Sequence, residues 1–136
     1  VVNLAARIEG QSKSYGVKTV IGPETNDSVK ENYATLQLDM IAVKGKKEAV
    51  TIFTMVGDSN FKESSDFKNL ENKHNKILKS YFNQEWDDCL NEMNTAKNLC
   101  NNLMSDYYNI MSERINEFKN KPPPQNWDGV YVATSK

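Results

Sequence analysis

This chain has little cysteine and histidine, no excess of charge of either sign and no long apolar run. Its two cysteines, Cys89 and Cys100, form no CxxC pair, and only one histidine accompanies them, which argues against a zinc site. Nothing in the sequence indicates secretion, so two reduced cysteines that pack in a core are favoured over a disulfide.

The formal net charge is only −1, and the charges are balanced along the chain. Residues 1–60 hold seven basic and seven acidic residues, which leaves ten of 17 and eleven of 18 for the remainder. This balance excludes a general pull toward nucleic acid or an anionic membrane. No apolar stretch approaches the roughly 20 residues of a membrane-spanning helix, and no signal peptide is visible. A length of 136 residues allows one domain or two small ones.

The first fifteen residues, VVNLAARIEGQSKSY, carry the polar pair that bears most directly on function. Asn3 and Arg7 lie one helical turn apart, so in a helix both side chains leave from the same face. Leu4, Ala5 and Ile8 fall on the adjoining face and predict packing against a core. A guanidinium can hold phosphate oxygens and an amide can bind a ribose, which makes the pair a candidate anion or sugar site. By spacing alone, a solvated pair on a surface helix is the simpler interpretation.

The next part of the chain predicts a mixture of short helices and strands. Residues 17–21 predict a β-branched strand that a Gly-Pro pair stops, and residues 25–33 predict a short helix. Residues 34–43 and 49–56 alternate as two antiparallel strands joined at a turn around Gly45.

Three lysines flank this turn, at Lys44, Lys46 and Lys47. They could hold a polyphosphate, or they could keep an exposed sheet edge soluble. The charge pattern by itself favours the solubilising role.

Between residues 66 and 121, apolar residues recur at spacings of three and four, which predicts three amphipathic helices in an antiparallel bundle. The three stripes are Phe67, Leu70, His74, Ile77 and Tyr81; Trp86, Cys89, Leu90, Met93, Ala96 and Cys100; and Met104, Tyr108, Met111, Ile115 and Phe118. Residues 59–65 are the predicted linker before them. His74 lies in an apolar stripe with no carboxylate or thiol placed beside it, which favours a packed structural histidine over a catalytic one.

Three stretches resemble, in order and spacing, the rear part of the class III adenylate and guanylate cyclase catalytic domain. They are VNLAARIEG with the following Tyr-Gly, then VIGPET, then LDMIAVKGKKEAVTIFTMVG. The resemblance covers about residues 1–57. It implies an α+β fold: a partial ferredoxin-like cyclase domain of helix, strand, helix and β-hairpin over residues 1–58, followed by a small helical bundle.

The same resemblance implies a reaction, the conversion of ATP or GTP to a 3′,5′-cyclic nucleotide and pyrophosphate. Arg7 would stabilise charge on the α-phosphate and the leaving pyrophosphate, Asn3 would position the ribose, and Lys44 would neutralise the outer phosphates. Two Mg or Mn ions would be held by aspartates that lie upstream of this segment in the family. Because cyclase sites form between two catalytic domains, a homodimer is implied, and this chain alone is expected to be inactive.

The arrangement of Tyr81, Trp86 and Ala96 resembles about one tetratricopeptide-like hairpin within residues 66–121. The tail, residues 122–136, begins with three prolines that predict a rigid spacer rather than a peptide-binding motif, and continues with a short strand-like piece. This ending resembles that of bacterial adenylate cyclases with an extracytoplasmic CHASE2 sensor. It implies a cytoplasmic location for this portion of a parent that is anchored to the inner membrane.

Two functions of different classes remain open. The chain begins at Val1 without a methionine and reads as a fragment, which is expected to supply the Asn, Arg and Lys half of a cyclase site. Alternatively, it is a non-catalytic cyclase remnant whose helical hairpin is a regulatory or protein-interaction module. Two aspartates at metal-binding spacing upstream of Val1 would favour the enzyme.

Overall fold

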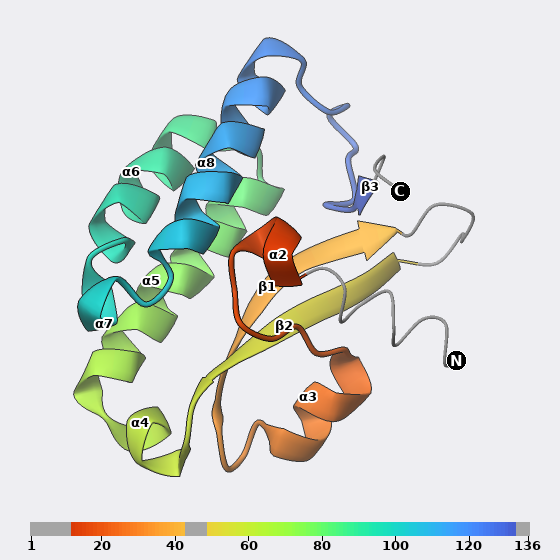
Figure 1. The fold of residues 1–136 in the computed structure, drawn as a ribbon. Helices are drawn as coiled ribbons and strands as arrows, with labels where there is room; N and C mark the ends of the chain where they lie inside the picture. The colour runs from red at the N-terminus through yellow and green to blue at the C-terminus, as the bar shows by residue number, and fades with distance from the viewer. Residues whose placement is uncertain (1–11, 43–48, 133–136) are drawn as a thin grey trace.

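The computed structural model describes residues 12–42 and 49–132. Its elements are α2 (Ser12–Tyr15), α3 (Pro23–Val29), β1 (Ala34–Ala42), β2 (Ala49–Gly57), α4 (Ser59–Glu63), α5 (Ser65–Phe82), α6 (Trp86–Ala96), α7 (Leu99–Asn102), α8 (Ser105–Asn120) and β3 (Tyr131–Val132). Figure 1 shows a β-hairpin with the longer helices along one side, while α2 lies against α8 and α3 against β2. The predicted α+β fold, a hairpin followed by a helical segment, is confirmed.

The sheet is built on the antiparallel β1–β2 hairpin that the sequence alternation predicts. β3 adds in parallel to β1, so the order of the described strands is β2-β1-β3. Leu36, Leu38 and Ile41 of β1 are buried. A register shift between Gln37 and Asp39 lets two consecutive residues, Leu38 and Asp39, both be buried. The irregularity therefore takes a carboxylate into the core.

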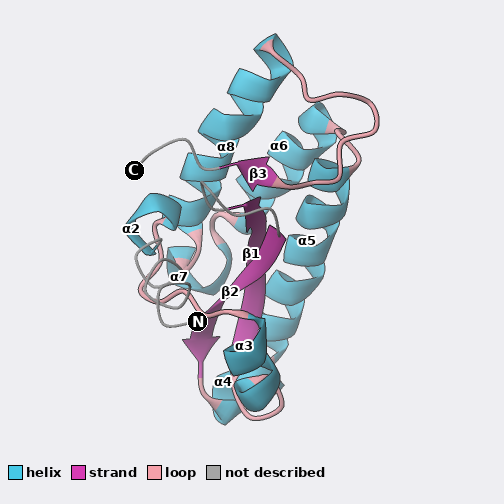
Figure 2. Ribbon diagram, turned by 90° about the vertical axis from the view of Figure 1, so that its right-hand side faces the viewer, coloured by secondary structure: helices cyan, strands magenta, loops and turns pink. Residues whose placement is uncertain are grey.

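The helices α5, α6 and α8 are the three predicted amphipathic helices, and they lie side by side (Figure 2). α5 and α8 contact β1, and α6 packs on α5 and α8. α5 begins where the Ser64 hydroxyl accepts a hydrogen bond from the Phe67 amide at 3.1 Å. It ends at Phe82, and Gln84 two residues later has a φ of 60°. The buried faces of the helices and of β1 form a single hydrophobic core.

The first part of the hairpin unit differs from the prediction in two places. The sequence predicts a strand over residues 17–21, but only Ile21 pairs, in an isolated bridge with Phe53. Pro23 begins α3 two residues later and lacks an N–H, so the pairing does not continue. α3 ends at Val29 rather than at Tyr33, because a turn closed by the Tyr33 amide on the Val29 carbonyl (2.9 Å) leads the chain into β1.

The second helix of the bundle is shorter than its apolar stripe predicts. α6 ends at Ala96, and Cys100, Asn101 and Asn102 have positive φ angles of 55°, 57° and 63°. These left-handed residues interrupt the right-handed helix, and the chain reverses there. α8 then begins at Ser105 and packs back on α6.

Residues 59–65, the predicted linker, form α4 and the first residue of α5. The Asp58 carboxylate caps α4 by accepting a hydrogen bond from the Phe61 amide at 3.0 Å, and Ser64 caps α5. The polar composition that predicts a loop here supplies two helix N-caps. The hydrophobic core includes residues on both sides of this segment.

Candidate functional site

The three predicted site residues, Asn3, Arg7 and Lys44, lie outside the described residues. The structure describes the segments that adjoin them in sequence: α2 begins five residues after Arg7, and β1 ends two residues before Lys44. The contacts of these adjoining segments are therefore the part of the candidate site that can be built from the structure.

Direct hydrogen bonds join the described parts of the three stretches that resemble a cyclase. The hydroxyl of Tyr15, the described end of the first stretch, donates to Asp39 Oδ2 of the third stretch at 2.6 Å. Ile21 of the second stretch exchanges two backbone hydrogen bonds with Phe53 of the third, at 2.8 and 2.9 Å. The described parts of the three stretches thus meet at the hairpin.

Arg114 of α8 lies at the centre of a buried polar cluster beneath this hairpin. One guanidinium nitrogen, Nη1, donates to Asp39 Oδ2 at 2.6 Å and to the Tyr81 hydroxyl at 3.0 Å. The other, Nη2, donates to the Tyr15 hydroxyl at 3.4 Å. The ring of Tyr131 covers the guanidinium, with 3.5 Å between Cζ and the ring centroid. One side chain therefore links α2, β1, α5 and β3.

The electrostatics of the cluster are those of a buried ion pair among neutral phenols. Burial raises the pKa of the Asp39 carboxyl, while Arg114 and the hydrogen bonds from Tyr15 and the Met40 amide act in the opposite direction. Burial also disfavours the charged guanidinium, but Asp39 raises the pKa of Arg114 above its usual value. Burial and the Asp39 charge raise the pKa of Tyr15, so its hydroxyl keeps its proton and donates. These groups satisfy one another and hold the elements together.

A second set of helix side chains satisfies backbone carbonyls at the register shift of β1. The carbonyl of Gln37 accepts a hydrogen bond from His74 Nε2, and that of Leu38 accepts one from the Tyr107 hydroxyl. His74 Nδ1 then accepts from the Tyr108 hydroxyl at 2.8 Å, because Nε2 must carry the proton. Burial lowers the pKa of His74 to about 4, so the ring is neutral. The prediction of a packed structural histidine is confirmed.

Sequence reasoning missed both members of the buried ion pair. Arg114 stands three residues after Met111 and one before Ile115, so it lies on the apolar face of its helix. Asp39 stands between apolar residues of a predicted strand. A single charge inside each apolar pattern was the available signal, and their opposite signs would have suggested a pair.

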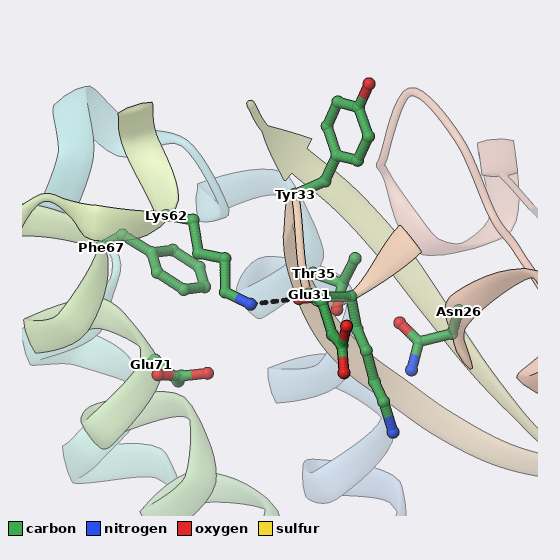
Figure 3. Close-up of a pocket in the computed structure, with 8 residues that line it drawn as sticks. Asn26, Glu31, Tyr33, Thr35, Lys62, Phe67 and Glu71 are labelled. Atoms are coloured by element: carbon green, nitrogen blue, oxygen red, sulfur yellow. Dashed lines mark hydrogen bonds between the residues drawn. The ribbon is translucent and has the colours of Figure 1, made fainter. Parts of the chain in front are cut away.

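The described residues also line an open cavity of about 370 Å³ between α3, α4, α5 and the start of β1. Its lining residues are Asn26, Lys30, Glu31, Tyr33, Thr35, Lys62, Phe67 and Glu71. Figure 3 shows Lys62, Phe67 and Glu71 opposite Asn26. Lys62 donates to the Lys30 carbonyl, and the buried Asn26 Oδ1 has no partner among the described residues. Two lysines and two glutamates balance each other, so the cavity suits a small polar molecule and gives no preference for a polyanion.

The two cysteines are free thiols, and burial raises the pKa of Cys89 to about 12. Across residues 12–42 and 49–132, no three His, Cys, Asp or Glu side chains gather in a way that could hold a metal ion. No helix in the same ranges is long and apolar enough to cross a membrane. Comparisons with models of protein families, with curated proteins and with solved structures find no match to this chain.

Proposed function

We propose that this chain is the C-terminal portion of a class III nucleotide cyclase catalytic domain, which converts ATP to 3′,5′-cyclic AMP and pyrophosphate in intracellular signal transduction. The observation that carries the proposal is that Tyr15–Asp39 and Ile21–Phe53 join the described parts of the three cyclase-like stretches. A chance resemblance in three separate stretches would not require them to be neighbours. A shared nucleotide site does require it.

The proposed roles follow from the chemistry of the three side chains. Arg7 offers a permanently charged donor fork to the α-phosphate and the departing pyrophosphate, where negative charge develops. Asn3 holds the ribose through its amide, and Lys44 offers a point charge to the outer phosphates. Together they stabilise charge and orient the substrate.

The metal ions that the family uses, Mg or Mn, do not fit the described residues, because these offer no cluster of carboxylates. The only buried carboxylate there, Asp39, is already paired with Arg114 and Tyr15. The cyclase resemblance assigns metal binding to aspartates that lie upstream of this segment in the family. The site would lie between this portion and a second catalytic domain, in a homodimer whose parent is anchored in the inner membrane with this portion in the cytoplasm.

The proposal is tested by cyclic-nucleotide production from ATP and from GTP by the longer protein to which this portion would belong. Arg7→Ala should lower turnover by about 10²- to 10³-fold, the typical effect of removing one preorganised donor. Lys13→Ala is the matched control, because Lys13 is an exposed cation of α2 close in sequence. Wild-type turnover in folded Arg7→Ala would contradict the role of Arg7.

A second candidate function is a non-catalytic cyclase remnant that acts as a regulatory or protein-interaction module. It is favoured by the charge balance of the cavity around Asn26, which gives a triphosphate no net attraction at that cavity. The coding sequence upstream of Val1 separates the two candidates. Two aspartates at metal-binding spacing support the cyclase, and a stop codon or their loss supports the remnant.

A further inference from the structure

The end of the described chain, residues 127–132, is anchored by a cluster of aromatic rings at one end of the helical bundle. The Trp127 ring lies 5.4 Å from Tyr81, 5.6 Å from Phe118 and 6.2 Å from Trp86, measured between ring centroids. Aromatic pairs at these separations add to the stabilisation that comes from burial. Trp127 therefore fixes where the chain returns after the proline run.

The backbone conformation of residues 128–130 is tightly constrained. Gly129 has a φ of +87°, and a Cβ at this position would lie 2.7 Å from Phe82 Cδ1. The Trp127 indole donates to the Val130 carbonyl at 3.0 Å, and the Val130 amide donates to Asp128 Oδ1 at 3.0 Å. This turn leads directly into β3.

β3 contacts the end of the hairpin in two ways. It pairs in parallel with the last two residues of β1, with Tyr131 opposite Ile41. The Tyr131 ring also lies 3.5 Å from the guanidinium carbon of Arg114, the residue that is bound to Asp39 of the same strand. Residues 127–132 therefore contact both the backbone of β1 and the ion pair that Asp39 of β1 forms with Arg114.

We propose that residues 127–132 are a positioning element that fixes the end of β1, and that Tyr131 and Arg114 are positioning residues for the nucleotide site. The inference rests on the proposed function, because β1 ends two residues before Lys44 in the sequence. Neither positioning residue touches the nucleotide. They act by holding the strand from which the lysine segment continues.

The first test measures amide hydrogen exchange along β1 in this chain. Tyr131→Ala and Trp127→Ala should raise exchange at Ile41 and Ala42 by about 10-fold or more, and leave Leu36 at the wild-type rate, because β3 pairs only with the end of the strand. Asn126→Ala is the control, since this exposed residue precedes the anchor. Unchanged exchange at Ile41 and Ala42 would overturn the proposal.

The second test measures kcat and KM for ATP in the longer protein. Tyr131→Ala should lower kcat/KM by about 10- to 100-fold, the scale expected when a catalytic group is misplaced by about 1 Å. Tyr131→Phe should retain activity, because it keeps the ring over the Arg114 guanidinium. A fall in kcat/KM in Tyr131→Ala with the urea midpoint unchanged would separate positioning from a loss of folding.

The outcomes separate this inference from the proposed function. Wild-type activity together with faster exchange and lower kcat/KM in Tyr131→Ala supports both. An active wild-type protein whose Tyr131→Ala variant turns over normally overturns the positioning role and leaves the cyclase assignment intact. A wild-type protein that forms no cyclic nucleotide overturns the proposed function, and the positioning role falls with it.

Discussion

Replacing Arg114 by methionine should be among the most destabilising single changes in this protein. Asp39 has no exposed surface, and without Arg114 its carboxylate would keep only the Tyr15 hydroxyl and the Met40 amide as donors. Breaking a buried ion pair by removing one partner typically costs about 3–5 kcal/mol. Since the total stability of a domain is about 5–15 kcal/mol, Arg114→Met should leave the chain close to unfolding.

The double variant Asp39→Asn/Arg114→Met provides the decisive comparison, because it removes both charges. We expect it to be more stable than Arg114→Met alone by about 2 kcal/mol or more, as the buried carboxylate is then gone. The loss of unfolding free energy in Arg114→Met should also be smaller at acid pH. Folding raises the pKa of Asp39 above its unfolded value. Protonation of this carboxyl at acid pH therefore stabilises the folded state, and the stabilisation is lost as the pH rises through the folded pKa.

Urea unfolding followed by tryptophan fluorescence measures these differences, and the same helix offers a matched control. Lys119 of α8 forms an exposed ion pair with Asp87 at 2.7 Å, so Lys119→Met should cost less than about 1 kcal/mol. A loss below about 1 kcal/mol in Arg114→Met, with no recovery in the double variant, would refute the view that a buried ion pair joins the helices to the hairpin.

Three further predictions concern other parts of the chain. The pKa of His74 falls from 6.5 to about 4 on folding. Its contribution to the free energy of unfolding is therefore complete above pH 6.5 and is lost by about 1.4 kcal/mol per pH unit as the pH falls toward 4. Urea midpoints at pH 7 and pH 5 should show this loss, and His74→Gln should lack it. Asn102→Gly should raise Tm by about 2–4 °C because glycine adopts the φ of 63° without strain, and a lower Tm in a thermal melt would contradict this. A maleimide should modify the half-buried Cys100 in the native protein and the buried Cys89 only in urea, as mass spectrometry can show; equal native labelling would argue against the described packing.

Regular periodicity made much of the fold predictable from the sequence. The alternation in β1 and β2 and the spacing of apolar residues in α5 and α8 were long enough to identify these elements. Local geometry limited the rest: α6 stops at Ala96 because left-handed residues follow, and a proline at position 23 leaves only Ile21 paired from the predicted first strand.

Less of the candidate site could be predicted from the sequence. Arg114 and Asp39 lie 75 residues apart in sequence, so no local pattern links them, and only the packing of α8 beneath β1 brings them together. Asn3, Arg7 and Lys44 stay predictions that depend on the cyclase resemblance. The described structure contributes the neighbouring contacts that support it.

The proposed cyclase site requires the amide of Asn3, the guanidinium of Arg7 and the ammonium of Lys44 to bind one triphosphate. The measurement is an NMR titration of the longer protein with a methylene-linked ATP analogue, followed through backbone and side-chain shifts. We expect the shifts to concentrate at these three residues and to disappear together in Arg7→Ala. Shifts confined to the cavity around Asn26, or scattered over surfaces that exclude the three residues, would contradict it.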